Sequence, residues 1–374
     1  MKVLHLATHL NSGGITKYVL ELVEPLERND IELQVASSGG ECAHLFEEKG
    51  VRVYALNIRT KNELHPKLYM SLPDLVGIIR REGIGALHAH TRVTQVMAHW
   101  ARVICGVPVV TTCHGFYKNR LGRRLLPAWG DRVIAISEAV GADLATNFGV
   151  ADSRIAVIPN GVNVSALHAA YSAHVPAAVK KGFGFGSDDP VLVIIARLVE
   201  VKGQACVINA VDRLRGTHPK IRLLIVGDGP DRDKLKERVR KLGLERHVVF
   251  TGTVKDITEP LAAADIFLLP ATWREAFGLS IVEAMVCRKP VVVSETWALA
   301  GMLRGESGGI LVDPNSLESV TAATDRLLRD PELREKMGSE GRRRVELELS
   351  VDLMARKISE VYGDISAIRA TSSA

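Results

Sequence analysis

Residues 265–287 read Asp-Ile-Phe-Leu-Leu-Pro-Ala-Thr-Trp-Arg-Glu-Ala-Phe-Gly-Leu-Ser-Ile-Val-Glu-Ala-Met-Val-Cys. The apolar run at 265–269 predicts a buried strand, and the apolar spacing over 279–287 predicts a helix. Proline, glycine and charged residues fill the loop between them. A strand, a loop and a helix in this order form the repeating unit of a parallel sheet covered by helices on both faces.

The same alternation continues in both directions from this stretch. In the first half we predict strands at 3–7, 31–36, 51–56, 84–88, 107–112, 132–136 and 155–158, and helices at 15–28, 71–82, 94–104 and 137–147. In the second half we predict strands at 191–196, 221–226, 247–251, 265–269 and 290–294, and helices at 204–215, 231–242, 279–287, 316–329 and 351–369. The pattern indicates an α/β protein.

The alternation is interrupted once, between residues 164 and 190. This segment holds alanines, serines, two prolines and the glycine-rich run 181–186, so we interpret it as a linker. We therefore expect two doubly wound Rossmann-like domains, at 1–170 and 171–350, facing a cleft, with the helix at 351–369 able to pack back on the first. In such sheets ligands bind beyond the carboxyl ends of the strands.

Composition excludes several classes of protein. At ~100–200 residues per domain, a chain of 374 residues fits two domains. Apolar residues make up 47% and charged residues 24%, as in globular proteins, and a net charge of +5 is too weak to indicate nucleic-acid binding. Five scattered cysteines without a CxxC pair indicate free thiols in a reducing compartment. With no signal peptide and no long apolar stretch, we expect a cytoplasmic location.

Cations follow the strand predicted at 191–196. Arg197 and Lys202-Gly203 come directly after it, and two cations at the mouth of a parallel sheet suit a diphosphate. Either residue taken alone could equally be a solvated surface cation. The DxD sequence at 231–233 follows a proline that can start a helix, so we interpret its acids as favoured by the helix dipole and not as metal ligands.

Two carboxylates occupy the stretch quoted first. Glu275 lies in the loop and Glu283 in the following helix, while Gly278 and Leu279 open that helix, so that their amides can face a phosphate. A carboxylate there disfavours phosphate and should instead accept hydrogen bonds from sugar hydroxyls. Cations for phosphates and carboxylates for hydroxyls together predict a nucleotide-sugar site.

The first half carries glycines and histidines at strand ends. Gly13 and Gly14 precede a predicted helix, either as an anion-binding loop or as a plain tight turn. His88-Ala-His90 places both rings on one face of a strand, but with no third ligand evident nearby we expect no metal. His114 ends the next strand and either points into the cleft or is a buried, hydrogen-bonded histidine.

These residues together resemble the retaining glycosyltransferases of the GT-B fold (group 1, family 4-like), a family that includes sucrose synthases and bacterial α-mannosyl- and α-glucosyltransferases. The resemblance extends over nearly the whole chain, and the Glu275…Glu283 pair is its most specific part. The other motifs are Gly13-Gly14, His88-Ala-His90, Thr112-Cys-His-Gly115, Ser137-Glu138, Pro159-Asn-Gly-Val-Asn163, Arg197 with Lys202-Gly203, Val226-Gly-Asp-Gly-Pro230 and Gly252-Thr-Val.

The resemblance implies a role for each candidate residue. Arg197 and Lys202 would neutralise the donor diphosphate, Glu283 would bind the ribose and Glu275 the donor sugar. The amides of Phe277, Gly278 and Leu279 would hold phosphate or sugar, Gly13 and Gly14 would lie near the phosphates, and His114 would contact the transferred sugar. The resemblance further implies a hexosyltransferase that retains the anomer, needs no metal or cofactor, uses a UDP- or GDP-sugar, and acts on a glycan or lipid-linked acceptor for cell-envelope polysaccharide or lipopolysaccharide.

One segment departs from the family pattern. Where the family usually has a Gly-Gly turn and then a Pro-Glu pair, this chain has Glu295-Thr-Trp-Ala-Leu-Ala-Gly-Met302. Two other functions remain open, and this segment suggests only the second of them. One is a nucleotide-sugar epimerase on a similar scaffold, which the Glu275–Glu283 spacing disfavours, and the other is a catalytically weakened nucleotide-sugar-binding protein.

Residues 116–129 combine four cations with aromatic and leucine side chains and contain no acid. The cations are Lys118, Arg120, Arg123 and Arg124, among Phe116, Tyr117, Leu121, Leu125, Leu126 and Trp129. Such a segment suits peripheral contact with an anionic membrane surface. The alternatives are that the leucines pack inward, that the arginines are solvated, or that they bind an anionic glycan.

Overall fold

The computed structural model describes residues 1–119 and 121–372, in two compact units. The first unit runs from Met1 to Gly161 and includes the C-terminal segment from Val351, and the second runs from Val162 to Ser350. The first unit thus ends before the expected boundary at residue 170. All five cysteines are free. In the described residues, no helix combines the length and the apolar character needed to cross a bilayer.

The first unit contains a sheet of seven parallel strands in the order β3-β2-β1-β4-β5-β6-β7. Each predicted strand of the first half is present. Their bounds are β1 (Lys2–Leu6), β2 (Glu32–Ser37), β3 (Val53–Ala55), β4 (Ala86–Ala89), β5 (Val109–Cys113), β6 (Arg132–Ala135) and β7 (Ile155–Val157).

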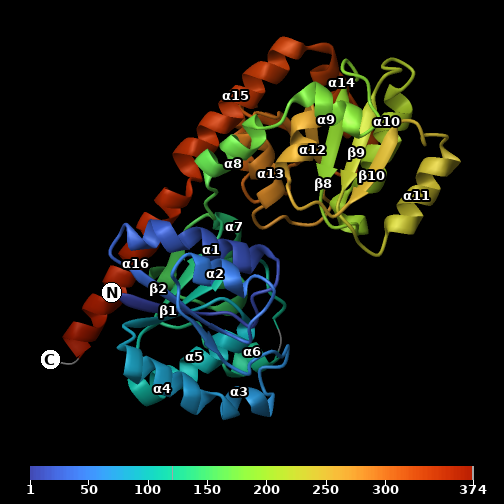
Figure 1. Ribbon diagram of the computed structural model, residues 1–374. Coiled ribbons are helices and arrows are strands. Elements are labelled where there is room, and N and C mark those ends of the chain that lie inside the picture. Colours follow the sequence, from blue (N-terminus) through green and yellow to red (C-terminus); the bar gives the residue numbers. More distant parts are fainter. Residues whose placement is uncertain (120, 373–374) are drawn as a thin grey trace. The chain divides into compact units, whose positions relative to one another are not determined.

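Helices cover both faces of this sheet (Figure 1). Residues of α1 (Gly14–Glu27), α2 (Ala43–Glu48) and α16 (Val351–Ser372) share one apolar core with the sheet, and those of α3 (Pro66–Met70), α4 (Leu72–Glu82) and α5 (Arg92–Cys105) share another. The short α6 (Leu121–Leu125) follows β5, and α7 (Glu138–Phe148) packs on β6 and β7. The sheet alternation separates the cores, because Val3 of β1 belongs to the first and its neighbour Leu4 to the second.

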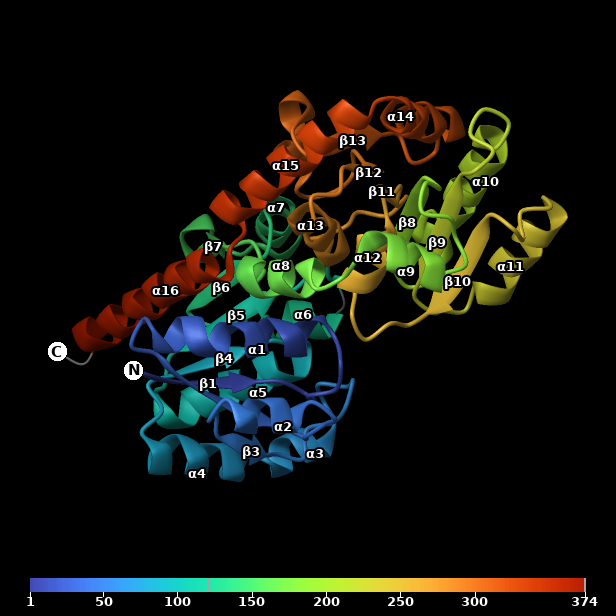
Figure 2. The same ribbon diagram turned by 45° about the horizontal axis from the view of Figure 1, so that its top comes forward.

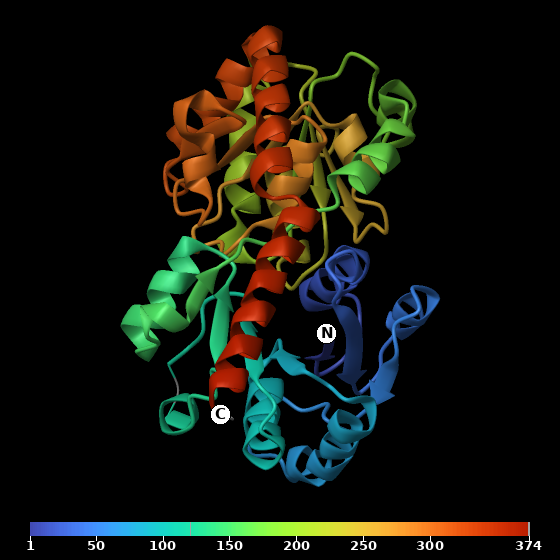
Figure 3. The same cartoon turned by 90° about the vertical axis from the view of Figure 1, so that its left-hand side faces the viewer.

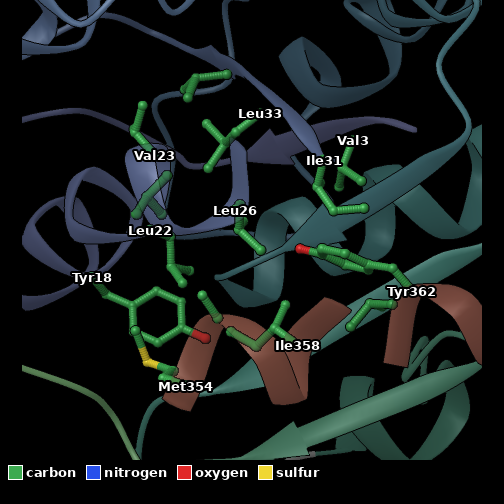
Figure 4. Close-up of a cluster of buried hydrophobic side chains, with 14 of the residues drawn as sticks. Val3, Tyr18, Leu22, Val23, Leu26, Ile31, Leu33, Met354, Ile358 and Tyr362 are labelled. Carbon is green, nitrogen blue, oxygen red and sulfur yellow. The ribbon is translucent and has the colours of Figure 1, made fainter. Parts of the chain in front are cut away.

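The C-terminal helix α16 packs against α1 in the first of these cores (Figures 3 and 4). Its buried residues recur every three or four positions, as in an amphipathic helix, and are Val351, Met354, Ala355, Ile358, Val361, Tyr362 and Ile365. The C-terminal segment therefore completes the core of the unit that contains the N-terminus.

The second unit contains six parallel strands in the order β10-β9-β8-β11-β12-β13. They are β8 (Val191–Ile195), β9 (Arg222–Val226), β10 (Val248–Gly252), β11 (Ile266–Leu269), β12 (Val291–Ser294) and β13 (Gly309–Val312). The first five match predicted strands, and β13 was not predicted. Each unit is thus a Rossmann-like domain, as expected.

The helices of the second unit form two groups (Figure 2). Helix α10 (Gln204–Leu214) packs with α11 (Arg232–Lys241) and α14 (Leu317–Arg329), while α13 (Leu279–Val286) packs with α8 (Val164–Ser172) and α15 (Pro331–Glu348). The linker interpretation of 164–190 is wrong, because α8 and α9 (Pro176–Gly182) fill most of it and both pack on α12 (Thr258–Ala263). The alanines of this segment therefore belong to helices that pack on the second unit, and not to a flexible linker.

Candidate functional site

Each sheet reverses its strand order at one point, next to its first strand. In the first unit β1 lies between β2 and β4, and in the second β8 lies between β9 and β11. The loops that leave the carboxyl ends of two such strands separate and open a crevice, where ligands of doubly wound sheets bind. The predicted residues Gly13 and Gly14 follow β1, Lys202 follows β8 and Glu275 follows β11. The structure thus brings candidate residues to both crevices.

In the second unit, Lys202 and Glu275 form an ion pair between their side chains. Lys202 belongs to the 3-10 turn η2 (Glu200–Lys202) after β8, and both side chains are partly exposed. The next residue, Gly203, has a φ of +80°, and any side chain there would collide with the backbone of Pro270 at the end of β11. Glycine therefore lets the two strand-end loops pack closely enough for the ion pair to form.

Gly278 forms the N-cap of α13 in the left-handed conformation, with a φ of +75°. A Cβ there would lie 2.7 Å from Ile281 Cδ1 and 2.9 Å from Trp297 Nε1. Both the limited space and the left-handed backbone conformation therefore favour glycine at this position. The first amides of a helix have no partner within the helix and can bind an anion. Arg197, which follows β8, is exposed, whereas Glu283 of α13, a predicted ligand of the ribose, is buried at 4% exposure.

The segment that departs from the family pattern contacts the Glu275 loop. The buried Trp297 donates an indole hydrogen bond to the carbonyl oxygen of Phe277 at 2.5 Å. The amide of Ala298 donates to the carbonyl oxygen of Glu275 at 2.9 Å. The bulkier residues that replace Gly-Gly therefore hold the backbone of the loop between β11 and α13. Sequence reasoning missed Trp297, because nothing in the sequence pairs it with a loop twenty residues earlier.

The DxD residues lie where helix-start acids are expected. Helix α11 begins at Arg232, with Asp231 at its N-cap and Asp233 in its first turn. Both positions are close to the positive end of the helix dipole.

In the first unit, Gly13 is the N-cap of α1 and Gly14 its first residue. The amide of the preceding Ser12 donates to the carboxylate of Glu41 at 2.8 Å. A backbone amide of this loop therefore faces a carboxylate of the protein itself.

Four histidines, His5, His88, His90 and His114, gather on the face of the sheet that α1 and α16 cover. The residue alternation along β1, β4 and β5 directs His5, His88 and Thr112 to the same side as Val3, Ala86 and Val110 of the first core, and His5 pairs in register with His88. The rings of His88 and His90 stack at 4.4 Å, so both lie on one face as predicted. Sequence reasoning missed His5, because strand register cannot be read from one chain.

The imidazoles form a continuous series of hydrogen bonds with Tyr362 of α16 and Thr112 of β5. His88 contacts Thr112 Oγ1 through Nε2 at 2.7 Å and the Tyr362 hydroxyl through Nδ1 at 2.6 Å. The same hydroxyl contacts His5 Nε2 at 3.1 Å, and His5 Nδ1 contacts His90 Nε2 at 2.9 Å. His90 Nδ1 then contacts His114 Nε2 at 3.1 Å. His114 is half-buried and is the outer end of the series.

Burial keeps these imidazoles neutral. Removal from water lowers the pKa of His5 to about 3 and that of His114 to about 4, and it lowers the pKa of His88 and of His90 well below the usual range. Neighbouring histidines add a smaller effect in the same direction for His88 and His90. At neutral pH the four rings therefore act as polar groups and not as cations.

The expectation that His88 and His90 lack a third metal ligand nearby is wrong, because nitrogens of His5, His88 and His90 lie within 4.8 Å of one another. All six ring nitrogens of these residues are nevertheless engaged in the hydrogen bonds above. A metal ion would have to displace several of those bonds in a fully buried place, so the arrangement fits a polar network better than a metal centre.

The segment 116–129 differs in part from the amphipathic surface that we expected. Arg123 is buried, with its guanidinium 4.2 Å from the ring centre of Tyr117 and 4.8 Å from that of Trp129, which is also buried. Leu121 and Leu125 are exposed, as are Lys118 and Arg124. Arg120 lies outside the described residues. The inward packing thus involves an arginine, a tryptophan and Leu126, which packs against the second apolar core, while Leu121 and Leu125 remain at the surface.

Comparisons with known proteins agree with this geometry. A family model described as "Glycosyl transferases group 1" matches residues 177–344, and one described as "Glycosyltransferase Family 4" matches residues 12–166. The GDP-mannose-dependent monoacylated α-(1-6)-phosphatidylinositol monomannoside mannosyltransferase of Corynebacterium glutamicum is 30% identical over 370 residues, which cover 93% of this chain and 94% of that protein.

Solved structures share the fold over nearly the whole chain. A glycosyltransferase from Rickettsia africae superposes with a TM-score of 0.86 at 21% identity, covering 97% of this chain and 98% of its own. HepE from Anabaena, solved in complex with UDP and glucose, gives 0.82 at 22% identity, with 97% and 100% covered. None of these matches favours the epimerase alternative. The chain belongs to the group 1 glycosyltransferases of the GT-B fold.

Proposed function

We propose that this glycosyltransferase moves a hexose from a nucleoside-diphosphate sugar, a UDP- or GDP-sugar, to a glycan or lipid-linked acceptor, with retention of the anomer and without a metal. Two relatives support the donor class, since one is GDP-mannose-dependent and another was solved with UDP and glucose. The proposed setting is synthesis of cell-envelope polysaccharide or lipopolysaccharide.

The observation that carries the proposal is the ion pair between Lys202 and Glu275 at the reversal point of the second sheet. A ligand that contacts both groups has to offer an anion to the ammonium and a hydroxyl to the carboxylate within a few ångströms. The diphosphate and the sugar ring of a nucleoside-diphosphate sugar offer these two groups side by side.

The remaining roles in the proposal are those that the resemblance to the family implies. Arg197 and Lys202 neutralise charge on the leaving diphosphate, and the amides of Phe277, Gly278 and Leu279 supply hydrogen bonds to phosphate or sugar. Glu283 binds the ribose hydroxyls from α13. In the first unit, Gly13 and Gly14 lie near the phosphates and His114 contacts the transferred sugar. The enzyme thus chiefly stabilises a leaving group, in a front-face substitution through an oxocarbenium-like state.

Transfer and its stereochemistry can be measured together. We expect release of a nucleoside diphosphate from one member of a panel of UDP- and GDP-sugars incubated with membrane and glycan extracts. The one-bond carbon–proton NMR coupling at the new anomeric centre should show the same anomeric configuration as in the donor. A product of the opposite configuration would refute the retaining mechanism, and a complete absence of transfer or donor hydrolysis would favour the weakened binding protein.

The metal independence has its own test. Because Arg197 and Lys202 supply the positive charge at the diphosphate, activity should survive excess EDTA. Loss of transfer in EDTA, with recovery on adding magnesium or manganese, would contradict the proposed roles of these cations.

The acceptor side is proposed to favour an anionic group. A pocket of about 230 Å³ in the first unit is lined by Lys61, Arg92, Lys118 and Arg123, together with Glu63, Phe116 and Tyr117. Four cations against one acid leave a net positive lining, which suits the phosphate of a lipid-linked or lipopolysaccharide acceptor. Four of its lining residues, Phe116, Tyr117, Lys118 and Arg123, follow His114 closely in the chain.

Contact with an anionic membrane surface through α6 is part of the same proposal. Leu121 and Leu125 lie one helical turn apart and are exposed at 69% and 76%, with Lys118 and Arg124 exposed beside them in sequence. Flotation with anionic and with neutral vesicles tests it. We expect preferential recovery with anionic vesicles that is lost in a variant carrying Lys118→Glu, Arg124→Glu and Leu125→Ser. Arg123 is left intact because it is buried. Equal recovery in all four samples would refute the contact.

A further inference from the structure

The histidine series of the first unit has a proton order that can be derived bond by bond. A neutral imidazole carries one N–H donor and one lone pair, so a nitrogen that accepts a hydrogen bond obliges the other nitrogen of the same ring to donate. His5, His90 and His114 are joined nitrogen to nitrogen, and the Tyr362 hydroxyl joins His5 to His88. Reversing one bond therefore reverses all the bonds between Tyr362 and His114.

The Tyr362 hydroxyl decides between the two possible orders. It has one proton, which it can donate to only one of its two imidazole neighbours, and it must accept from the other. Its contact with His88 Nδ1 is 2.6 Å, a length typical of a hydroxyl donor, and its contact with His5 Nε2 is 3.1 Å, a length typical of an N–H donor. The hydroxyl is fully buried, and burial raises its pKa well above the usual range, so it keeps its proton.

The remaining bonds follow from this choice. His5 donates from Nε2 to the Tyr362 oxygen and so accepts at Nδ1 from His90 Nε2. His90 then accepts at Nδ1 from His114 Nε2, which leaves the Nδ1 of His114 unprotonated. His88, which accepts from Tyr362 at Nδ1, donates from Nε2 to Thr112 Oγ1.

We propose that Tyr362, His5 and His90 are positioning residues that hold the outermost imidazole, His114, in its Nε2–H tautomer with Nδ1 as a hydrogen-bond acceptor. The proposal rests on the proposed function where it assigns a purpose, since an acceptor nitrogen at His114 would take a hydrogen bond from a hydroxyl of the transferred sugar. It also gives α16 a part in the site, because this C-terminal helix carries Tyr362 into the core that it shares with α1. Tyr18 of α1 belongs to the same core (Figure 4).

The experiment is two-bond proton–nitrogen NMR of the full chain labelled with ¹⁵N-histidine, in which protonated and unprotonated ring nitrogens resonate far apart. His114 is assigned from the resonances missing in His114→Asn. We expect wild-type His114 to carry its proton on Nε2. In Tyr362→Phe the shape of the core is kept, but His5 Nε2–H would be left buried without an acceptor, which costs free energy and favours the reversed order. The ratio of the two His114 tautomers should therefore shift at least tenfold toward Nδ1–H.

Tyr18→Phe is the matched control. The Tyr18 ring packs edge-on against His90 and His114, and its buried hydroxyl forms no hydrogen bond with the four imidazoles. This variant should leave the tautomer of His114 unchanged. A proton on Nδ1 in the wild type, an unchanged ratio in Tyr362→Phe, or equal shifts in both variants would overturn the proposal. The measurement needs no substrate, so it is independent of whether His114 contacts a sugar.

Discussion

His5, His88 and His90 are buried in the first unit at 1% exposure or less, and burial lowers the pKa of each. The unfolded chain binds protons below its ordinary histidine pKa of about 6.5, whereas the folded chain does not until a much lower pH. The unfolded state then holds more protons, so the free energy of unfolding falls as the pH decreases from about 6.5. Each histidine should cost about 1.4 kcal/mol between pH 7.5 and pH 5.5.

Urea unfolding followed by circular dichroism at these two pH values checks this expectation. The variant His5→Gln should lose about 1.4 kcal/mol of the pH dependence, whatever its stability at pH 7.5. The exposed His44 supplies the control, since His44→Gln should keep the dependence of the wild type. The same pH dependence in His5→Gln and in the wild type would show that His5 is not held neutral.

At the scale of single residues, the sequence predicted the local positions of the site residues better than their tertiary partners and their burial. Strand alternation placed His88 and His90 on one face, and the position of Gly278 before a helix predicted its place as N-cap. The partners of these residues could not be predicted, because His5, Tyr362 and Trp297 reach them through strand register and tertiary packing. The burial of Arg123 and Glu283 could not be predicted either, because charged side chains are usually exposed and these two are enclosed by tertiary packing.

At the scale of elements, the periodic segments were predicted and the irregular ones were not. The long helix α15 escaped prediction because it is highly charged and contains Gly338 and Gly341. Its glycines serve packing, since side chains there would collide with the backbone at Arg288 or approach Gly308. The short helices α2, α3 and α6 have too few turns to show a period.

The loop between β11 and α13 supplies a prediction at this scale. In Trp297→Phe an aromatic ring stays, but the indole donor and part of the buried ring volume are lost, so the carbonyl of Phe277 loses its hydrogen bond. We expect a loss of at least about 1 kcal/mol in unfolding free energy and a higher donor KM, because the loop that carries Glu275 is less firmly held.

Trp273→Phe is the control from the same loop, since Trp273 is 65% exposed. Thermal unfolding measures the stability of both variants, and titration with the donor measures their donor KM. Only Trp297→Phe should change these two quantities. If both tryptophan variants behave alike, Trp297 does not hold the loop.

At the scale of the whole molecule, the chain divides into two units with the same architecture, and its last helix belongs to the first. The alternation of strands and helices predicted both sheets. The boundary was harder to predict, because α8 and α9 are rich in small residues and resemble a linker in composition.

A substitution in α16 tests whether this helix is part of the first core. Ile358 is fully buried there, and Ile358→Ala should lower the unfolding free energy by ~2–5 kcal/mol. Ile104, on α5 and 49% exposed, is the control, and Ile104→Ala should change the stability by no more than about 0.5 kcal/mol. Urea unfolding measures both, and equal small effects would mean that α16 contributes little to the core.

The measurement that tests the central claim most directly is calorimetric titration of UDP and GDP into the wild type, Lys202→Ala and Lys220→Ala. Lys202 follows β8 at the proposed diphosphate site, whereas the exposed Lys220 lies before β9 at the opposite edge of the same sheet. We predict that at least one nucleotide binds the wild type, that Lys202→Ala weakens it at least tenfold, about 1.4 kcal/mol, and that Lys220→Ala leaves it unchanged. Binding of neither nucleotide to the wild type, or equal affinity in the wild type and Lys202→Ala, would contradict the account.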